Sequence, residues 1–322
     1  TRFDVTCIGN AIVDVIASAD DSFLADNEII KGAMNLVDEN RSNALYERMP
    51  AGVEQSGGSA GNTAAGIASL GGKAAYIGKV RDDQLGGIFA HDLRATGVHF
   101  GTPMATTGPS TARCLIIVTE DAQRSMNTYL GACVELSPED IDPEIIAASQ
   151  VTYMEGYLFD PPKAKEAFRR ASEIAHAAGR KVSMTLSDSF CVDRYRDEFR
   201  DFITSHVDIL FGNEDEIKSL YQVENFDDAF QHLRGACETV ALTRSEKGAV
   251  IVAGDEIHVL DAAPVEKVID TTGAGDLYAA GFLFGYTNGR SLSEAHHIGA
   301  KAAAEIISHY GARPSRALKT LI

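Results

Sequence analysis

The stretch DTTGAGDL at residues 270–277 decides both the fold and the chemistry predicted for this chain of 322 residues. Gly273 and Gly275 flank Ala274 ahead of a small-residue helix, so backbone N–H groups are left free at a helix N-terminus and form an anion site. Asp276 stands in the first turn of that helix, where its ionised form is favoured and can accept a proton from a hydroxyl. Such a pairing indicates phosphoryl transfer. Taken alone, the pattern fits equally well a simple turn with a helix-favouring aspartate.

Upstream of this stretch, strand-like and helix-like segments alternate, which is typical of βαβ units on a parallel sheet. The alternating segments are 151–155, 163–178, 181–186, 192–205 and 207–211. Closely spaced apolar runs after residue 239, with a turn at Gly254-Asp255, predict antiparallel strands at the edge of the sheet. We therefore predict an α/β fold, a three-layer α/β/α body around a central, mainly parallel sheet.

A different pattern interrupts this body. Residues 112–119 and 124–129 are rich in β-formers and are separated by a short polar turn, which predicts a hairpin with no helix between its strands. We predict a single domain over residues 1–322, with a small β-sheet lid formed from about 12–55 and 98–130. No repeat or Pro-rich linker indicates a second domain.

A second glycine-rich motif, SGGSAGN, occupies residues 56–62. Gly57 and Gly58 would let a polyol approach the backbone, and Asn62 could bond its hydroxyls, although tight packing is the alternative role for such glycines. The motif also spells GxSxG around Ser59. A nucleophile elbow must follow a buried strand, however, and residues 51–56 are too polar and glycine-rich to form one.

Composition and charge exclude several classes of protein. Lys and Arg total 29 against 46 Asp and Glu, a net charge of −17, which argues against nucleic acid or an anionic membrane as the main partner. The five cysteines have no metal-ligand spacing and fit a reducing compartment, and no apolar run approaches the roughly 18 residues of a membrane span. We expect a cytoplasmic protein. The chain also lacks the Walker and HExxH patterns.

The stretches Gly57–Gly87 and Asp270–Gly281 together resemble the two signatures of the ribokinase or PfkB family of sugar and nucleoside kinases. The resemblance covers essentially the whole chain. It implies an ATP-dependent kinase in which Asp276 is the catalytic base and residues 273–275 form the anion hole. It also implies an α/β/α body with a β lid over the acceptor site.

The resemblance implies sites for ATP and Mg²⁺. Asn213 and Glu216 match the NxxE element of the family, in which Glu216 organises magnesium through water; by spacing alone they predict only a helix cap. Thr243, Ser245 and Gly248 resemble the nucleotide-binding strand and loop.

The acceptor site is implied in the same way. Asp14, Gly58 and Asn62 look like binders of ribose hydroxyls, since a carboxylate and an amide can hold a vicinal diol. Arg124 falls where the family carries a lid arginine that could neutralise the transferring phosphate. The full expected set is Asn10, Ile12, Asp14, Gly57, Gly58, Asn62, Arg124, Leu130 and Ala132, with the last two lining the base pocket.

A loop near the C-terminus resembles the monovalent-cation site of ribokinases. Gly311 and Ser315 belong to this loop, and backbone carbonyls near Asp270 and Thr272 would complete the site. Potassium is therefore a candidate cofactor beside ATP and magnesium.

The substrate is indicated by finer resemblances. Residues 9–14 and 207–214 are similar to those of adenosine kinases. Thr272, however, stands where those enzymes carry Asn, and the resulting sequence TGAGD at residues 272–276 is the commoner one in sugar kinases. We expect phosphorylation of the 5′-hydroxyl of a nucleoside, adenosine first, with a sugar kinase acting on ribose, fructose or a related carbohydrate as the alternative. A non-catalytic nucleoside-binding regulator is a third interpretation, but it has no need of Asp276. The oligomeric state stays open between monomer and homodimer.

Overall fold

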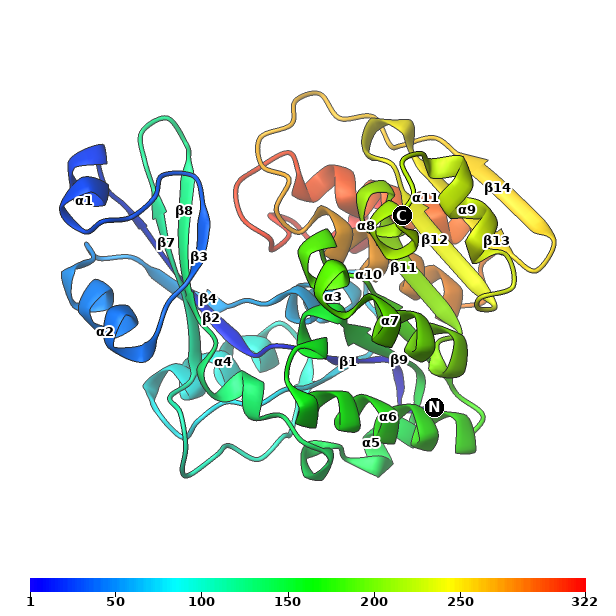
Figure 1. The fold of residues 1–322 in the computed structure, drawn as a ribbon, viewed down its shortest axis with the longest axis horizontal. Coiled ribbons are helices and arrows are strands. Elements are labelled where there is room, and N and C mark those ends of the chain that lie inside the picture. Colours follow the sequence, from blue (N-terminus) through cyan, green and yellow to red (C-terminus); the bar gives the residue numbers. More distant parts are fainter.

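The computed structural model describes residues 1–322 and contains two β-sheets of unequal size (Figure 1). The larger sheet has nine strands in the order β14-β13-β12-β11-β10-β9-β1-β5-β6. Neighbouring strands are parallel except where β13 pairs with β12 and β14, which confirms the predicted parallel sheet with an antiparallel edge. The strands are β1 (Phe3–Ile8), β5 (Ala74–Ile77), β6 (His99–Phe100), β9 (Ser149–Glu155), β10 (Lys181–Thr185), β11 (Ile209–Asn213), β12 (Thr239–Thr243), β13 (Ala249–Ala253) and β14 (Glu256–Leu260).

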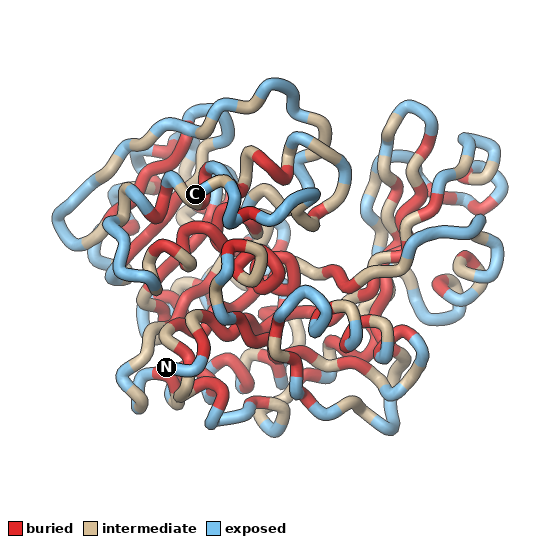
Figure 2. Tube along the Cα trace, turned by 180° about the vertical axis from the view of Figure 1, so that it is seen from behind, coloured by how far each residue is buried: buried red, intermediate tan, exposed pale blue.

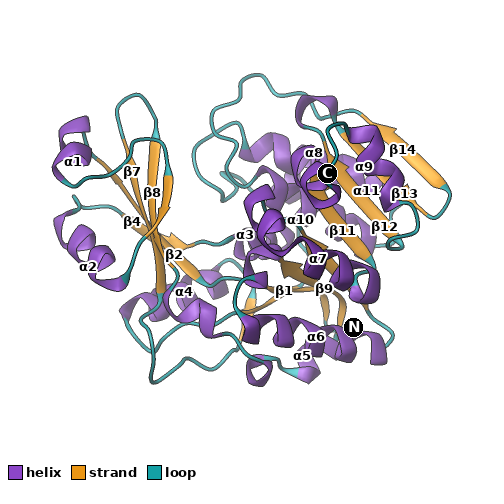
Figure 3. Cartoon of the chain, in the orientation of Figure 1, coloured by secondary structure: helices purple, strands orange, loops and turns teal.

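Helices cover both faces of this sheet, as the predicted three-layer body requires (Figure 3). Because side chains alternate along a strand, Ile209 and Phe211 of β11 join one hydrophobic cluster and Leu210 joins the other. The first cluster includes side chains from α3 (Ser59–Ser69), α4 (Gln84–Ala95), α10 (Ala274–Thr287) and α11 (Leu292–Ile306). The second includes α5 (Pro143–Ala147), α6 (Pro162–Ala177), α7 (Ser189–His206), α8 (Glu214–Tyr221) and α9 (Phe226–Leu233).

Helix α10 is held close to α11 by glycines. A Cβ built on Gly281 would lie 2.6 Å from the Cα of Gly299, so the two helix backbones touch where neither carries a side chain. The N-terminus of α10 carries the DTTGAGDL stretch. The close packing therefore fixes the direction in which this helix N-terminus points.

The smaller sheet has five strands in the order β3-β8-β7-β2-β4 and stands beside the body (Figure 1). Its strands are β2 (Ile12–Ser18), β3 (Met34–Leu36), β4 (Val53–Ser56), β7 (Ala112–Val118) and β8 (Arg124–Tyr129). Helices α1 (Asp21–Asp26) and α2 (Glu39–Arg48) lie on the side of this sheet that faces away from the body. Burial is densest in the centre of the body, while the outer loops of the small sheet are exposed (Figure 2).

The small sheet takes its strands from residues 12–56 and 112–129. The predicted segment 98–130 therefore began too early, because His99 and Phe100 pair with β5 and extend the large sheet. The chain crosses between the two sheets four times: after β1, after β4, between β6 and β7, and after β8. None of the helices has the length and apolar character needed to cross a membrane.

Candidate active site

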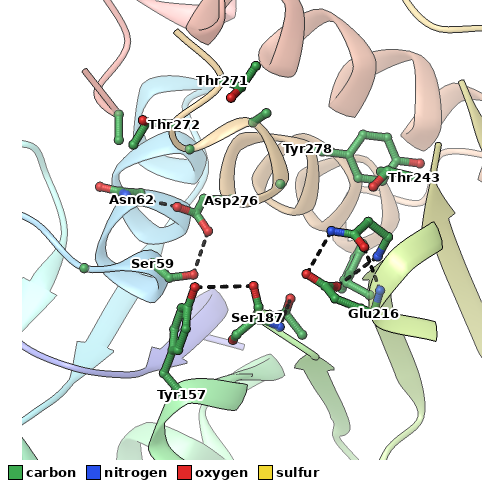
Figure 4. Close-up of a pocket in the computed structure, with 18 of the residues that line it drawn as sticks. Ser59, Asn62, Tyr157, Ser187, Glu216, Thr243, Thr271, Thr272, Asp276 and Tyr278 are labelled. Carbon is green, nitrogen blue, oxygen red and sulfur yellow. Dashed lines mark hydrogen bonds between the residues drawn. The ribbon is translucent and has the colours of Figure 1, made fainter. Parts of the chain in front are cut away.

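A cavity of about 380 Å³ lies between the small sheet and the carboxyl ends of the parallel strands. Such strand ends are where ligands bind in open α/β sheets. Its body side is formed by residues after β9, β10 and β11 and by the N-terminus of α10 (Figure 4). Twelve of the predicted site residues meet there: Asp14, Gly58, Asn62, Arg124, Asn213, Glu216, Thr243, Thr272, Gly273, Ala274, Gly275 and Asp276.

Asp276 is half-buried in the first turn of α10 and is held by two side chains of α3. Its Oδ1 accepts a hydrogen bond from the Ser59 hydroxyl at 2.6 Å, and its Oδ2 accepts one from the Asn62 amide at 3.0 Å. Burial raises the pKa of Asp276, and the hydrogen bonds from Ser59 and Asn62 and the charge of Arg313 oppose this rise. The carboxylate therefore has a fixed orientation and a greater affinity for a proton than an exposed aspartate.

The N-terminus of α10 is an open anion site. Gly273, the N-cap residue, has a φ of 80° and offers no side chain to the free N–H groups. The Ala274 N–H donates to the Thr271 carbonyl at 3.2 Å, while the N–H of Gly275 lies in the first turn, where the helix itself supplies no acceptor. These groups line the cavity beside Asp276. The first turn of α10 therefore provides both the N–H groups that can bind an anion and the carboxylate that can accept a proton.

The small sheet contributes one face to the cavity. Alternate positions of its strands, Asp14, Cys114, Ile116 and Met126, line the cavity, whereas their neighbours such as Leu115 pack in the hydrophobic cluster. Burial raises the pKa of Asp14 to about 6, although the charges of Arg313 and Arg124 oppose the rise. A carboxylate, a thiol and apolar side chains together suit a ligand that has both hydroxyls and an aromatic or apolar part.

The glycines of residues 56–62 are required by packing as well as by ligand access. A Cβ on Gly57 would lie 2.5 Å from Cγ of Asp14, and Gly57 itself is outside the cavity lining. Gly58 has a φ of 83°, and a Cβ there would lie 2.3 Å from the carbonyl oxygen of Asn10. The glycine motif thus makes room for the Asp14 carboxylate and for the end of β1.

Arg124 and Asp270 form an ion pair that joins the small sheet to the body. The Nη1 of Arg124 lies 2.5 Å from Oδ2 of Asp270. Asp270 also accepts hydrogen bonds from the backbone N–H and hydroxyl of Thr272 and from the N–H of Gly311. Two residues predicted for different roles, phosphate neutralisation and cation binding, are therefore paired with each other.

The predicted NxxE element forms a capping box at α8. Asn213 Oδ1 accepts from the Glu216 N–H, and the Glu216 carboxylate accepts from the N–H and the side-chain amide of Asn213, each at 2.9 Å. Burial raises the pKa of Glu216 to about 7. Thr243 lies across from this carboxylate on the cavity wall (Figure 4).

Several predicted residues lie outside the cavity lining. They are Asn10, Ile12, Gly57, Leu130, Ala132, Ser245, Gly248, Asp270, Gly311 and Ser315. Gly131, with a φ of 45°, turns the chain after β8 so that Ala132 is buried in the short helix η1 (Gly131–Glu135) instead of facing the cavity. Gly248 has its own packing reason, because a Cβ there would lie 1.9 Å from the carbonyl oxygen of Leu260.

The structure adds residues that the sequence analysis missed. The GxSxG spelling draws attention to Ser59 only as a nucleophile, but its hydroxyl donates to Asp276. Its position three residues before Asn62, on the same helix face, is the sequence signal for this contact. Strand β4 precedes it as a partly exposed edge strand. Tyr157 and Ser187, just beyond the ends of β9 and β10, also line the cavity (Figure 4).

Glu155 is another missed residue, at the end of β9 and 1% exposed. Its carboxylate accepts from the backbone N–H of Ala60 at 2.9 Å and of Asn10 at 3.3 Å. Burial raises its pKa to about 8. It caps α3, whose N-cap residue is Gly58, and so places Asn10 near the site through its backbone.

The family described as "pfkB family carbohydrate kinase" matches residues 3–319. An adenosine kinase from Sinorhizobium meliloti has a solved structure that is 59% identical, with a TM-score of 0.91, covering 100% of this chain and 98% of that one. A probable sugar kinase protein from Rhizobium etli CFN 42 is 56% identical, with the same TM-score and coverage.

More distant relatives divide in the same way between nucleoside and sugar kinases. Adenosine kinase 1 of Arabidopsis thaliana is 25% identical over 330 residues, covering 94% of each chain. Fructokinase-1 of Oryza sativa subsp. japonica is 29% identical over 241 residues, covering 73% of this chain and 74% of the relative.

Proposed function

The chain belongs to the pfkB family of carbohydrate kinases, and we propose that it transfers the γ-phosphoryl group of ATP to the 5′-hydroxyl of a nucleoside, with adenosine as the preferred acceptor and AMP as the product. The observation that carries this proposal is the placement of Asp276. Its carboxylate is held by Ser59 and Asn62 beside the uncapped N-terminus of α10, on the wall of the cavity.

The likeness to the S. meliloti adenosine kinase supports adenosine as the acceptor, because it extends over the whole chain. The inner face of the small sheet supports a nucleoside too. Asp14 can accept hydrogen bonds from ribose hydroxyls, while Ile116 and Met126 offer apolar contact to a base. A sugar kinase is the second candidate, favoured by Thr272 and by the likeness to the R. etli protein and to fructokinase-1.

In this mechanism Asp276 accepts the proton of the 5′-hydroxyl as the hydroxyl oxygen attacks the γ-phosphorus. The bond from that phosphorus to the bridging oxygen breaks, and ADP leaves. The free N–H groups at Gly275 and its neighbours stabilise the charge on the equatorial oxygens. Since the transition state is loose, positioning and charge stabilisation supply most of the rate, with general-base help worth about 10²- to 10⁴-fold.

The small sheet acts as a lid in this proposal. It brings Asp14 and Arg124 over the acceptor, and its closure excludes water from the transferring phosphoryl group. The ion pair between Arg124 and Asp270 ties this lid to the loop that leads into the anion site.

Magnesium fits at Glu216. Each carboxylate oxygen of Glu216 accepts one hydrogen bond from Asn213 and keeps lone pairs toward the cavity, and carboxylate oxygens are the donors that magnesium prefers, often through water. When bound, the ion neutralises charge on the phosphates of ATP.

At the site expected for a monovalent cation, the side chains of Asp270 and Ser315 are bonded within the protein, so the ligands left are the backbone carbonyls that the resemblance implies. Both oxygens of Asp270 accept hydrogen bonds from the protein, and the Ser315 hydroxyl donates to Glu305 at 2.6 Å. No step is therefore assigned to potassium.

The test is ADP release from MgATP with adenosine, guanosine, inosine, cytidine, ribose and fructose offered separately. We expect the highest kcat/KM with adenosine. Turnover with ribose or fructose and none with nucleosides would support the sugar kinase instead. No turnover with any acceptor, in protein that binds ATP, would contradict the assigned chemistry.

Acceptor affinity should fall in acid because of Asp14. Its pKa is raised from 3.8 to about 6, so the carboxylate that accepts hydroxyl hydrogen bonds is present above pH 6 and is lost as the pH falls through 6. Between pH 8 and pH 5 the KM for the acceptor should rise about tenfold, as the ionised fraction of Asp14 falls. Steady-state kinetics at saturating ATP measure this.

The matched control for that measurement is Asp14→Asn, which should have a high KM that does not change over the same pH range. A wild-type KM that stays constant from pH 8 to pH 5 would show that Asp14 does not hold the acceptor.

A further inference from the structure

Arg313 lies half-buried between the C-terminal loop and the glycine motif of residues 56–62, and its Nε is fully enclosed. Its Nη2 donates to the carbonyl and hydroxyl oxygens of Ser56 at 2.8 and 2.9 Å, and its Nη1 donates to the carbonyl of Gly61 at 3.1 Å. The two carbonyls stand on either side of Gly58 and Ser59. The guanidinium thus holds both ends of the segment that presents Ser59 to Asp276.

Neutral oxygens accept all three of these hydrogen bonds, so no direct ion pair neutralises the guanidinium. Its charge is surrounded by the carboxylates of Asp14, Asp92 and Asp276 at longer range. Asp92 accepts from the N–H and hydroxyl of Ser56 at 2.7 and 2.6 Å, so Ser56 links the arginine to that carboxylate. Removing a guanidinium from water is costly, and this arrangement recovers only part of that cost through hydrogen bonds.

The residue before Arg313 contacts the anion site. A Cβ built on Gly273 would lie 2.9 Å from the Cβ of Ala312, and Ala312 itself lines the cavity. Two consecutive residues therefore touch the two halves of the site: Ala312 packs on the helix N-terminus, and Arg313 binds the glycine motif. Any shift of this loop would move both halves.

We infer that Arg313 is a positioning residue, which fixes the Ser56–Gly61 segment relative to the anion site and so keeps the Asp276 carboxylate oriented for proton transfer. The inference rests on the proposed kinase function for its catalytic consequence. Nothing in the sequence marked Arg313 itself, because its partners lie more than 250 residues away along the chain.

The electrostatic surroundings of Asp276 support this role. Burial raises the pKa of Asp276, and the charge of Asp276 in turn raises the pKa of Glu155 on β9 and of Glu216 on α8. Tyr153 and Tyr157 also face the group, but as neutral phenols. Arg313 is the cation that lowers the pKa of Asp276.

The test compares Arg313→Met, which removes the charge and the hydrogen bonds, with Arg313→Lys, which keeps the charge. We expect Arg313→Met to lower kcat/KM for the acceptor about 10²-fold, the loss typical of a misplaced catalytic group. The acid limb of its kcat/KM profile should move to higher pH, because Asp276 then binds its proton more readily. Arg313→Lys should leave the acid limb near its wild-type position while recovering only part of the rate.

A matched control is Arg180→Met, because Arg180 also donates to a backbone carbonyl, that of Ala147, but lies at the amino end of β10, away from the cavity. This variant should keep the wild-type kcat/KM and pH profile. Thermal unfolding of all three variants separates a loss of fold from a loss of positioning.

Hydrogen–deuterium exchange gives a second measurement that does not depend on turnover. In Arg313→Met the amides of residues 57–62 should exchange at least tenfold faster than in the wild type, and in Arg180→Met they should not. If the wild type phosphorylates no acceptor, the proposed function fails. The exchange measurement still tests whether Arg313 holds the segment of residues 57–62 in place. Unchanged exchange together with unchanged kcat/KM and acid limb would overturn the role of Arg313.

Discussion

Replacing Asp276 with asparagine should lower kcat by about 10²- to 10⁴-fold while changing the KM for the acceptor by less than about threefold. The amide has nearly the shape of the carboxylate and can still accept a hydrogen bond from Ser59. It cannot accept a proton from the attacking hydroxyl. The loss is therefore confined to the chemical step, and steady-state kinetics with adenosine and MgATP separate it from binding.

The control for this variant is Asp208→Asn. Asp208 also accepts a backbone hydrogen bond, from Val182, but it precedes β11 and so lies at the opposite end of the sheet from the cavity. Its kcat should equal that of the wild type. Near-wild-type turnover by Asp276→Asn would show that another group accepts the proton.

Gly273→Ala should lower kcat by about 10²- to 10³-fold, the usual loss when one donor of an anion hole is misplaced. The φ of 80° disfavours any L side chain, and the added Cβ would lie 2.9 Å from Cβ of Ala312. Either the first turn of α10 or the loop at Ala312 must shift. Both changes move the N–H groups away from the transferring phosphoryl group.

Gly179→Ala separates backbone strain from this displacement. Gly179 has a φ of 68°, and a Cβ added there would meet nothing within 4 Å, so the variant carries similar strain without a clash. It should lose stability like Gly273→Ala in thermal unfolding but keep its kcat. Equal kcat values for Gly273→Ala and the wild type would argue against the anion hole at this turn.

Local patterns made the body and one half of the site predictable. The alternation of strands and helices predicts the parallel sheet, because each short apolar run is followed by a helix long enough to cross back. Gly273 and Gly275 around Ala274 predict an open helix N-terminus, since both the turn and the missing cap are properties of adjacent residues. Asp276 needs no distant information to be placed in the first turn.

Residues that depend on distant partners were not predictable in the same way. The ion pair between Arg124 and Asp270 joins residues 146 positions apart in the sequence. The resemblance implied phosphate neutralisation for Arg124 and cation binding for Asp270, and so did not indicate that they pair. Ala132 was expected at the base pocket, but the reversal at Gly131 buries it, and a single glycine does not show in which direction the chain turns. His99 and Phe100 were assigned to the small sheet because a two-residue strand has too little pattern to choose a sheet.

The four crossings between the sheets bear on how the protein folds and how it can be redesigned. The parallel pairing of Ile12 with Ala112 joins segments 100 residues apart in the sequence, and such long-range pairing forms slowly, so we expect the small sheet to assemble after the body. It also cannot be cut out or exchanged between relatives as one continuous piece. Under the proposed function, single replacements on its inner face, at Cys114, Ile116 and Met126, are the simpler route to a changed acceptor preference.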